Sequence, residues 1–129
     1  MAYIDNELLF LNDTDTAASV TSKVLDLGTK GAFIHPLCID VKLTKALASG
    51  SIKTITVQSS ATEAFDSPVD EMQITVPAAI NQTAGPATLA QFFAPIRYGN
   101  RYVRIVVAGT SPTGGKLTAY MCAGATIRM

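Results

Sequence analysis

A chain of 129 residues is long enough for one domain with its own hydrophobic core, so neither a metal ion nor a disulfide is required to hold it together. Apolar residues make up 48% and charged residues only 16%, against a typical charged share of about 25%, which leaves Thr, Ser, Ala, Gly and Gln to cover much of the surface. Ten basic residues balance ten acidic ones, which argues against a nucleic acid as the main partner because phosphate binding relies on surplus positive charge.

The first apolar run, Ile4 to Leu11, predicts an N-terminal arm or edge strand. Asn12 to Thr16 follow it, and because such residues hydrogen-bond their own backbone in turns, the strand is expected to end there. Asp5 and Glu7 stand where a secretory signal would be basic, and no apolar run approaches the roughly 20 residues of a membrane helix. We therefore expect a soluble chain, made in a cytoplasm, with no membrane partner.

Alternating or β-branched side chains predict four further strands, at 22–27, 37–43, 52–59 and 72–76, joined by loops at 44–51 and 61–70. The clearest is 37–43, where Leu37, Ile39, Val41 and Leu43 alternate with Cys38, Asp40 and Lys42, as in a half-buried strand. In 52–59 the pattern places Lys53, Ile55 and Val57 on one side and Ile52, Thr54 and Thr56 on the other.

After a loop of small residues at 78–87, a strand is predicted at 88–94, with Phe92 and Phe93 on opposite faces and at least one of them in the core. Two more alternating runs flank the loop Gly109 to Gly115. The first places Val103, Ile105 and Val107 on one side, and the second places Leu117, Ala119 and Met121 on one side. Because the loop is rich in Gly, Pro and Ser, 97–121 is predicted to form a β-hairpin.

About eight short strands without a long amphipathic helix predict an all-β fold, an eight-stranded antiparallel jelly-roll sandwich. The prediction is a single domain, 1–129, with residues 1–15 as an N-terminal arm or edge strand. Residues 1–71 carry a net charge of 5 − 10 = −5 and residues 72–129 carry +5. Either strands of the two halves interleave and cancel this asymmetry, or the molecule has two oppositely charged patches.

No catalytic or metal-binding pattern emerges from the residues that could carry one. His35 is the only histidine, and an offset of three from Cys38 would point the two side chains to opposite faces of a strand. Cys38 and Cys122 have no metal-ligand spacing and are expected to be free thiols. Asp13 and Asp15 resemble the start of a calcium loop but lack its glycine and its final glutamate. We therefore expect no enzyme activity, cofactor or metal.

Two alternatives remain open on the same architecture. A carbohydrate-binding module is the first, because jelly rolls host lectins, and its sugar-stacking rings would come from Tyr3, Tyr98, Tyr102 or Tyr120. A hydrolase using Asp40, Asp66 or Asp70 is the second, although no partner residue for these acids can be identified.

The chain resembles the small jelly-roll capsid cement proteins, also called decoration proteins, of tailed bacteriophages. The resemblance spans nearly the whole length and is carried by the order and spacing of four segments: Glu7 to Asp13 (ELLFLND), Val24 to Gly28 (VLDLG), Thr56 to Pro68 (TVQSSATEAFDSP) and Arg101 to Tyr120 (RYVRIVVAGTSPTGGKLTAY).

This resemblance implies a homo-oligomer, with a dimer favoured over a trimer, that sits on the outer surface of an icosahedral virion and ties subunits of the major capsid protein together. It would be made in the cytoplasm of a bacterial host. Many copies, each burying about 800 Å² per partner, would then stabilise the shell through multivalency. Capsid or oligomer contacts are predicted in the arm and on the basic strand: Tyr3, Ile4, Leu8, Phe10, Arg97, Arg101 and Arg104.

Overall fold

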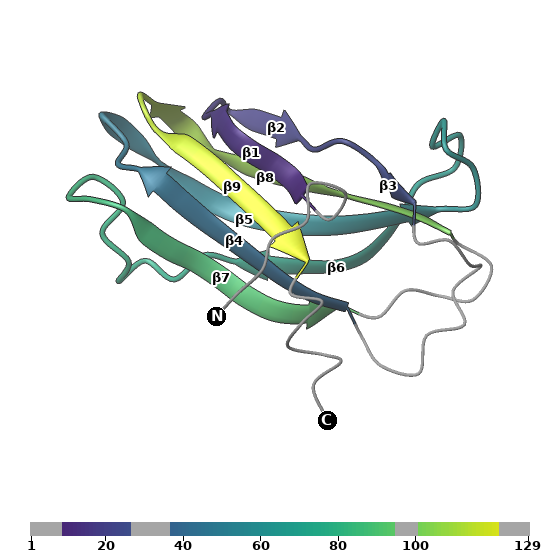
Figure 1. Ribbon diagram of the computed structural model, residues 1–129. Coiled ribbons are helices and arrows are strands. Elements are labelled where there is room, and N and C mark those ends of the chain that lie inside the picture. Colours follow the sequence, from purple (N-terminus) through teal and green to yellow (C-terminus); the bar gives the residue numbers. More distant parts are fainter. Residues whose placement is uncertain (1–8, 27–36, 95–100, 122–129) are drawn as a thin grey trace.

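The fold is described from a computed structural model, which covers residues 9–26, 37–94 and 101–121 (Figure 1). Within these ranges the chain forms strands and no helix, so none of them holds a helix able to cross a membrane. The strands are β1 (Leu9–Asp15), β2 (Ser19–Thr21), β3 (Leu25–Asp26), β4 (Leu37–Lys45), β5 (Ser49–Ser60), β6 (Val69–Thr75), β7 (Ala87–Ala94), β8 (Tyr102–Thr113) and β9 (Lys116–Met121).

The strands form two antiparallel sheets, packed one behind the other in Figure 1. The front sheet has the order β1-β9-β4-β7, and the back sheet has the order β2-β8-β5-β6. Because β3 also pairs with β8, β2 and β3 are two pieces of one interrupted strand, which leaves eight strand positions. Eight positions divided between two sheets in this order make a jelly roll, so the predicted all-β sandwich is confirmed.

The hydrophobic core lies between the two sheets. Val103, Ile105 and Val107 of β8 are all 0% exposed, and so are Leu117 and Ala119 of β9. Burying one such branched side chain stabilises the fold by roughly 1.5–3 kcal/mol. The alternation read from the sequence therefore identified the inward faces of both strands.

The predicted β-hairpin at 97–121 is wrong, although both of its strands exist. β8 belongs to the back sheet and pairs with β5, whereas β9 belongs to the front sheet and pairs with β1 and β4. The connection at Gly114 and Gly115 crosses from one layer to the other, and Gly114 has a φ of 79° that suits glycine. The two apolar faces thus meet across the core instead of lying side by side in one sheet.

β1 continues through the residues that were expected to end it. The strand runs to Asp15, and its register with β9 shifts between Leu9 and Leu11 and again between Leu11 and Thr14. Asp13 has a φ of 47°, in the left-handed region that Asp tolerates. The turn-forming residues therefore bend an edge strand instead of stopping it.

The strand predicted at 22–27 begins earlier and is split in two. Between β2 and β3 the chain leaves the regular ladder at Ser22, whose side chain is 7% exposed. The Ser22 hydroxyl accepts a hydrogen bond from the Ile105 backbone N–H at 2.9 Å and donates one to the Lys23 carbonyl at 2.9 Å. A buried serine thus satisfies a backbone group of β8 where the strand is interrupted.

β4 is more buried than its alternation suggested. Cys38 and Asp40, expected on the solvent side, are only 4% and 5% exposed. They lie on the outer face of the front sheet, where the register places Asp40 beside Tyr120 and Tyr120 beside Leu9. Tyr120 and Leu9 are each 8% exposed, so a second buried layer covers part of this face and the prediction of a half-buried strand is wrong there.

At the start of β5, the residues that face the core and those that face outward are the reverse of the predicted ones. Ile52, expected opposite Ile55, is 1% exposed in the core, while Lys53 is exposed. The pairing of β5 with β8 shifts between Ile52 and Thr54, and this bulge brings Ile52 and Ile55 to the same face. A bulge adds one residue to the strand, so a strict period of two fails across it.

Strands from the acidic and basic parts of the sequence interleave. The Arg101 side chain pairs with Asp26 and the Lys116 side chain pairs with Asp15, with N–O distances of 2.5 Å in each pair. Both contacts join residues of 1–71 to residues of 72–129. Within the described ranges, the charge asymmetry along the chain is therefore at least partly cancelled in space.

Candidate functional site

The outer face of the back sheet carries a row of polar side chains that crosses three strands. Register places Arg104 of β8 opposite Gln58 of β5, and Gln58 opposite Asp70 of β6. Arg104 Nε donates to Gln58 Oε1 at 2.8 Å, and Gln58 Nε2 donates to Asp70 Oδ1 at 2.9 Å. The three side chains hold one another in place, so the half-buried guanidinium of Arg104 is fixed in orientation.

Phe65 supplies an aromatic platform beneath this arginine. The ring centroid lies 4.3 Å from the guanidinium carbon of Arg104, close enough for a cation–π contact. Phe65 is 7% exposed and has a φ of 56°, uncommon for a bulky residue. Its loop is tied by hydrogen bonds from the Phe65 N–H to the Thr62 carbonyl, at 3.1 Å, and from the Thr62 N–H to Ser60 Oγ, at 3.1 Å. The platform is therefore held by its own loop.

A second arginine, Arg101, directly precedes β8. Arg101 binds both carboxylate oxygens of Asp26, through Nε at 2.5 Å and Nη2 at 2.8 Å, and its guanidinium carbon lies 5.5 Å from the centroid of the Tyr102 ring. The Arg101 charge is thus paired within the molecule, while Arg104 has a neutral amide as its hydrogen-bond partner. We call the seven residues Asp26, Gln58, Phe65, Asp70, Arg101, Tyr102 and Arg104 the arginine–aromatic surface.

Such a surface is suited to binding another protein. Arginine and tyrosine are enriched among the residues that dominate binding energy at protein interfaces, and preorganised side chains lose little freedom on binding. A guanidinium also presents several donors in one plane, which fits a carboxylate on the partner. Phe65 was not predicted from the sequence, because its position depends on a loop conformation that no short motif marks.

The predicted contact residues have different outcomes. Arg101 and Arg104 lie together in the arginine–aromatic surface, and their contact with a partner stays a prediction. Phe10 is 2% exposed and packs in the core between the sheets, and its predicted capsid or oligomer contact stays a prediction. Tyr3, Ile4, Leu8 and Arg97 lie outside the described residues.

A buried polar pair lies on the outer face of the front sheet. The hydroxyl of Tyr120 donates to Asp40 Oδ2 at 3.0 Å, and Lys42 Nζ lies 3.9 Å from the same oxygen. Burial raises the pKa of Tyr120 above its ordinary value, and the hydrogen bond with Asp40 acts in the same direction. Since Tyr120 is only 8% exposed, its ring is not open for stacking on a sugar, as the alternative function would require.

This pair predicts a pH effect that can be measured. In a spectrophotometric titration, the difference between the wild type and Tyr120→Phe should show one tyrosine that ionises above the ordinary pKa of 10.0. The folded state holds this proton more tightly than the unfolded chain does. The stabilisation is therefore complete below the unfolded pKa and is lost as the pH rises through the folded pKa. Ionisation of Tyr120 at or below the ordinary value would contradict the proposed environment.

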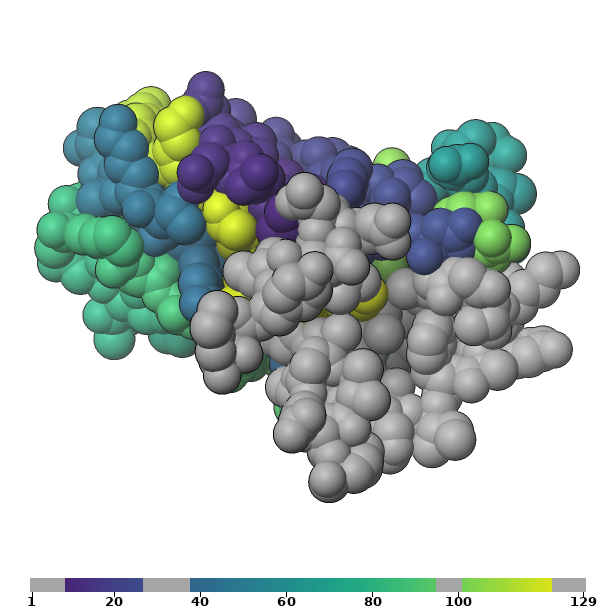
Figure 2. Space-filling view, in the orientation of Figure 1, coloured from purple at the N-terminus to yellow at the C-terminus, as the bar shows by residue number. Residues whose placement is uncertain are grey.

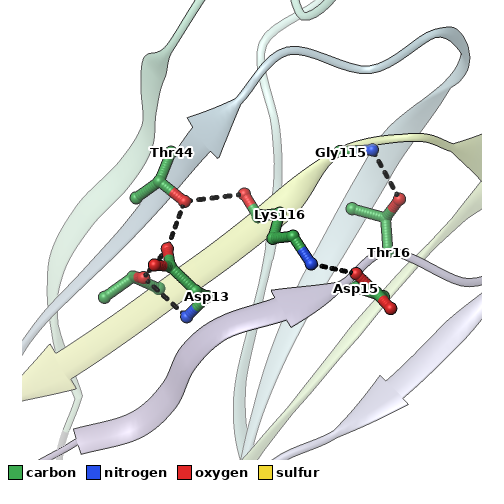
Figure 3. Close-up of polar contacts among 7 residues, drawn as sticks. Asp13, Asp15, Thr16, Thr44, Gly115 and Lys116 are labelled. Atoms are coloured by element: carbon green, nitrogen blue, oxygen red, sulfur yellow. Dashed lines mark hydrogen bonds and ion pairs between the residues drawn. The ribbon is translucent and has the colours of Figure 1, made fainter.

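Figure 3 shows a second polar cluster, where β1 pairs with β9 near the end of β4. Asp13 Oδ1 accepts a hydrogen bond from Thr44 Oγ1 at 2.8 Å, and Lys116 Nζ lies 2.5 Å from Asp15 Oδ1. The hydrogen bond and charge of Lys116 lower the pKa of Asp15, and Asp15 in turn raises the pKa of Lys116. The two acids that resembled a calcium loop thus fasten the edge strand to its neighbours.

The remaining chemical candidates are not brought together. Of the three acids considered for a hydrolase, Asp40 lies on the front sheet, Asp70 lies on the back sheet, and Asp66 lies in the connection between β5 and β6. In the part of the chain that the structure describes, no three metal-binding side chains converge. Cys38 is a buried free thiol, as expected, while His35 and Cys122 lie outside the described residues.

The fold and the arginine–aromatic surface define the protein as a jelly-roll sandwich with an outward-facing polar and aromatic patch. No protein-family model matches the chain, and no curated protein matches it. Among solved structures it is similar to the crystal structure of PirA, with a TM-score of 0.38 and 18% sequence identity over 85% of this chain and 96% of that chain. A likeness this distant adds no argument about function.

Proposed function

We propose that this chain is a capsid cement protein: a structural protein of a virion that binds the outer surface of an icosahedral phage capsid and stabilises contacts between major capsid subunits. The binding surface in this proposal is the arginine–aromatic surface. The chain acts by contact alone and carries out no reaction. Its partners are the major capsid protein and further copies of itself.

The observation that carries the proposal is the meeting of separate segments in this surface. The sequence resembles the cement proteins in four segments, and three of them supply the surface: 24–28 supplies Asp26, 56–68 supplies Gln58 and Phe65, and 101–120 supplies the two arginines and Tyr102. The fourth, 7–13, contributes to β1 and so borders the segment that forms β9. Segments that carry a family resemblance and also gather at one exposed place support a shared role for that place.

The rest of the back sheet's outer face supports the proposal through its composition. Beyond Arg104, Asp70 and Asp26, which belong to the arginine–aromatic surface, the ladder positions on this face are neutral: Ser19, Thr21, Thr54, Thr56, Gln73, Thr75, Val106 and Ala108. The free-energy cost of removing water from such a face on docking is small, because the face exposes few charges. The arginines at one end would then fix the orientation of the complex.

Binding should depend strongly on Arg104. We expect Arg104→Glu to weaken cosedimentation with capsids of the encoding phage by about tenfold or more, and Arg104→Lys to retain most of the binding. The wild-type affinity should also fall as salt is added, because the contact is partly electrostatic. Lys53→Glu is the matched control, since Lys53 is an exposed cation elsewhere on β5 and its reversal changes the net charge equally.

Three results would count against the proposal. The chain could be missing from purified virions on a denaturing gel, it could fail to cosediment with capsids, or Lys53→Glu could weaken binding as much as Arg104→Glu does. Selective binding on a glycan array, without capsid binding, would favour the carbohydrate-binding alternative instead.

A further inference from the structure

The four open edges of the two sheets are protected to different degrees. An exposed edge strand offers unpaired backbone groups to any other strand, and proteins usually block such edges with charges, bulges or short strands. β1 carries Asp13 and Asp15 and shifts register twice. β6 carries Asp70 and Glu71 and has one register shift. β2 and β3 are three and two residues long.

β7 is the edge that lacks charged protection. Within the described ranges it pairs with β4 and with no other strand, and in Figure 1 it lies at the rim of the front sheet. The green atoms at the left edge of Figure 2 belong to the part of the chain that leads into and begins this strand. Its sequence, ATLAQFFA, contains no charged residue and no proline. Indeed, no charged residue lies anywhere between Glu71 and Arg97, so the connection that leads into β7 is neutral as well.

The last five residues of this strand are regular and expose an aromatic ring. Ala90 to Ala94 pair one by one with Val41 to Leu37, and the irregularity of β7 lies before them. Phe93 is 58% exposed, and no other large hydrophobic side chain in the described ranges is as open. Phe92 packs against the core but remains half-buried, so part of its ring is also uncovered at this edge.

We propose that two copies of this chain pair antiparallel along the free edges of β7, around a twofold axis perpendicular to the sheet. Their front sheets then form one continuous sheet. In a twofold interface each surface meets its own copy, so a charge on this edge would meet a like charge. A neutral edge satisfies that condition, and the acid-bearing edges β1 and β6 do not. Because the β7 edge meets this twofold condition, we take a second copy of this chain as its occupant.

The faces of β7 also define the register. Residues directly opposite in an antiparallel pair point to the same face, so the axis must pass through a residue and not between two residues. Gln91 and Phe93 lie on the outer face, opposite Asp40 and Cys38 of β4. Centring the pair on Phe92 sets Phe93 of each copy opposite Gln91 of the other and brings the two Phe92 rings together. The uncovered parts of Phe92 are then buried by the same contact.

The test is the self-association of the purified chain, measured by sedimentation equilibrium. The wild type should be a dimer, and Phe93→Lys should weaken the dimer by at least about tenfold, because the aromatic contact is lost and two like charges face each other diagonally across the axis. Adding Gln91→Glu to Phe93→Lys should restore dimerisation, since each lysine then lies opposite a glutamate of the other copy. Phe93 and Gln91 are both exposed in the monomer, so all variants should keep the circular dichroism of the wild type. Gln91→Glu alone is the control for the new carboxylate opposite Asp40.

Thr75→Lys is the matched control, because Thr75 is an exposed residue on the edge strand β6 of the other sheet. It should leave the dimer unchanged. A monomeric wild type, an undisturbed Phe93→Lys dimer, or equal weakening by Thr75→Lys would overturn the proposal. Failure of the double variant to recover would overturn the register centred on Phe92. The measurement uses the chain alone, so its outcome is independent of capsid binding.

Discussion

Replacing Gly50 by alanine is expected to lower the free energy of unfolding by about 2–5 kcal/mol, one of the largest effects of any single substitution in this chain. Gly50 has a φ of 79°, which costs an L-residue roughly 1–2 kcal/mol. A Cβ at this position would also overlap with the carbonyl oxygens of Thr110 and Ser111 on β8. These are backbone atoms of a paired strand, so relief of the overlap requires the strands to move apart.

The consequence should extend beyond stability, because the pairing of β5 with β8 sets the arginine–aromatic surface. The same ladder that begins beside Gly50 places Gln58 opposite Arg104. Gly109 is under a similar constraint, since its Cβ would overlap with the Ser51 carbonyl. We therefore expect a variant at Gly50 to weaken capsid binding as well, where enough folded protein can be recovered to measure it.

Gly85→Ala provides the control for this prediction. Gly85 lies in the connection between β6 and β7, and a Cβ there would meet no atom within 4 Å. Its replacement should be neutral or should stabilise the protein by about 0.4–1 kcal/mol, because alanine restricts the unfolded chain. Urea denaturation of both variants gives the comparison. Equal stabilities for the Gly50 and Gly85 variants would show that the close approach of β5 and β8 is wrong.

The sequence predicted which residues face the core better than it predicted which strands are neighbours. Val103, Ile105 and Val107 were placed on one side because a strand has a period of two, and their burial confirms this. The same period is produced whether β8 and β9 form a hairpin or face each other across a sandwich. A short Gly-rich connection is compatible with both, so alternation alone could not reveal that this connection changes sheets.

The candidate site was only partly accessible to sequence analysis. Arg101 and Arg104 stood out as cations on an otherwise apolar strand, and they do lie in one surface. Phe65 was not singled out, since a left-handed backbone at a phenylalanine, in a loop stabilised by Thr62, has no sequence signature. Likewise, Ile52 and not Lys53 faces the core because of a bulge in β5. Bulges arise from the fit between two strands that are distant in sequence, so the sequence alone did not indicate this one.

Gln82→Ala should produce a loss of stability comparable to that of the Gly50 variant, through a different cause. Gln82 is 7% exposed in the connection between β6 and β7, and its side chain bonds both backbone groups of Ile52. Oε1 accepts from the Ile52 N–H at 2.7 Å, and Nε2 donates to the Ile52 carbonyl at 3.0 Å. These groups lie at the bulge, where β5 cannot satisfy them through its regular ladder.

Removing this side chain leaves two buried backbone groups without partners, and each such group costs about 1–3 kcal/mol. We expect a total loss of about 2–5 kcal/mol in denaturant unfolding. Gln82→Leu should lose nearly as much, although it retains apolar volume, because the hydrogen bonds and not the volume are missing. The Ile52 amide should also exchange its hydrogen much faster in both variants, since its partner is removed.

Gln73→Ala is the matched control, because the same truncation there removes one hydrogen bond, from Nε2 to Thr56 Oγ1 at 3.0 Å, at an exposed position on β6. It should cost no more than about 1 kcal/mol and leave the exchange of the Ile52 amide unchanged. A Gln82→Leu protein as stable as the wild type would contradict this account. If the account holds, Gln82 also anchors the chain that leads into β7, through its carbonyl and the Leu47 N–H at 2.8 Å. The substitutions keep this backbone contact and remove the two side-chain bonds to Ile52, the other anchor of the same segment, so they should also weaken the β7-mediated dimer, although Gln82 lies outside β7.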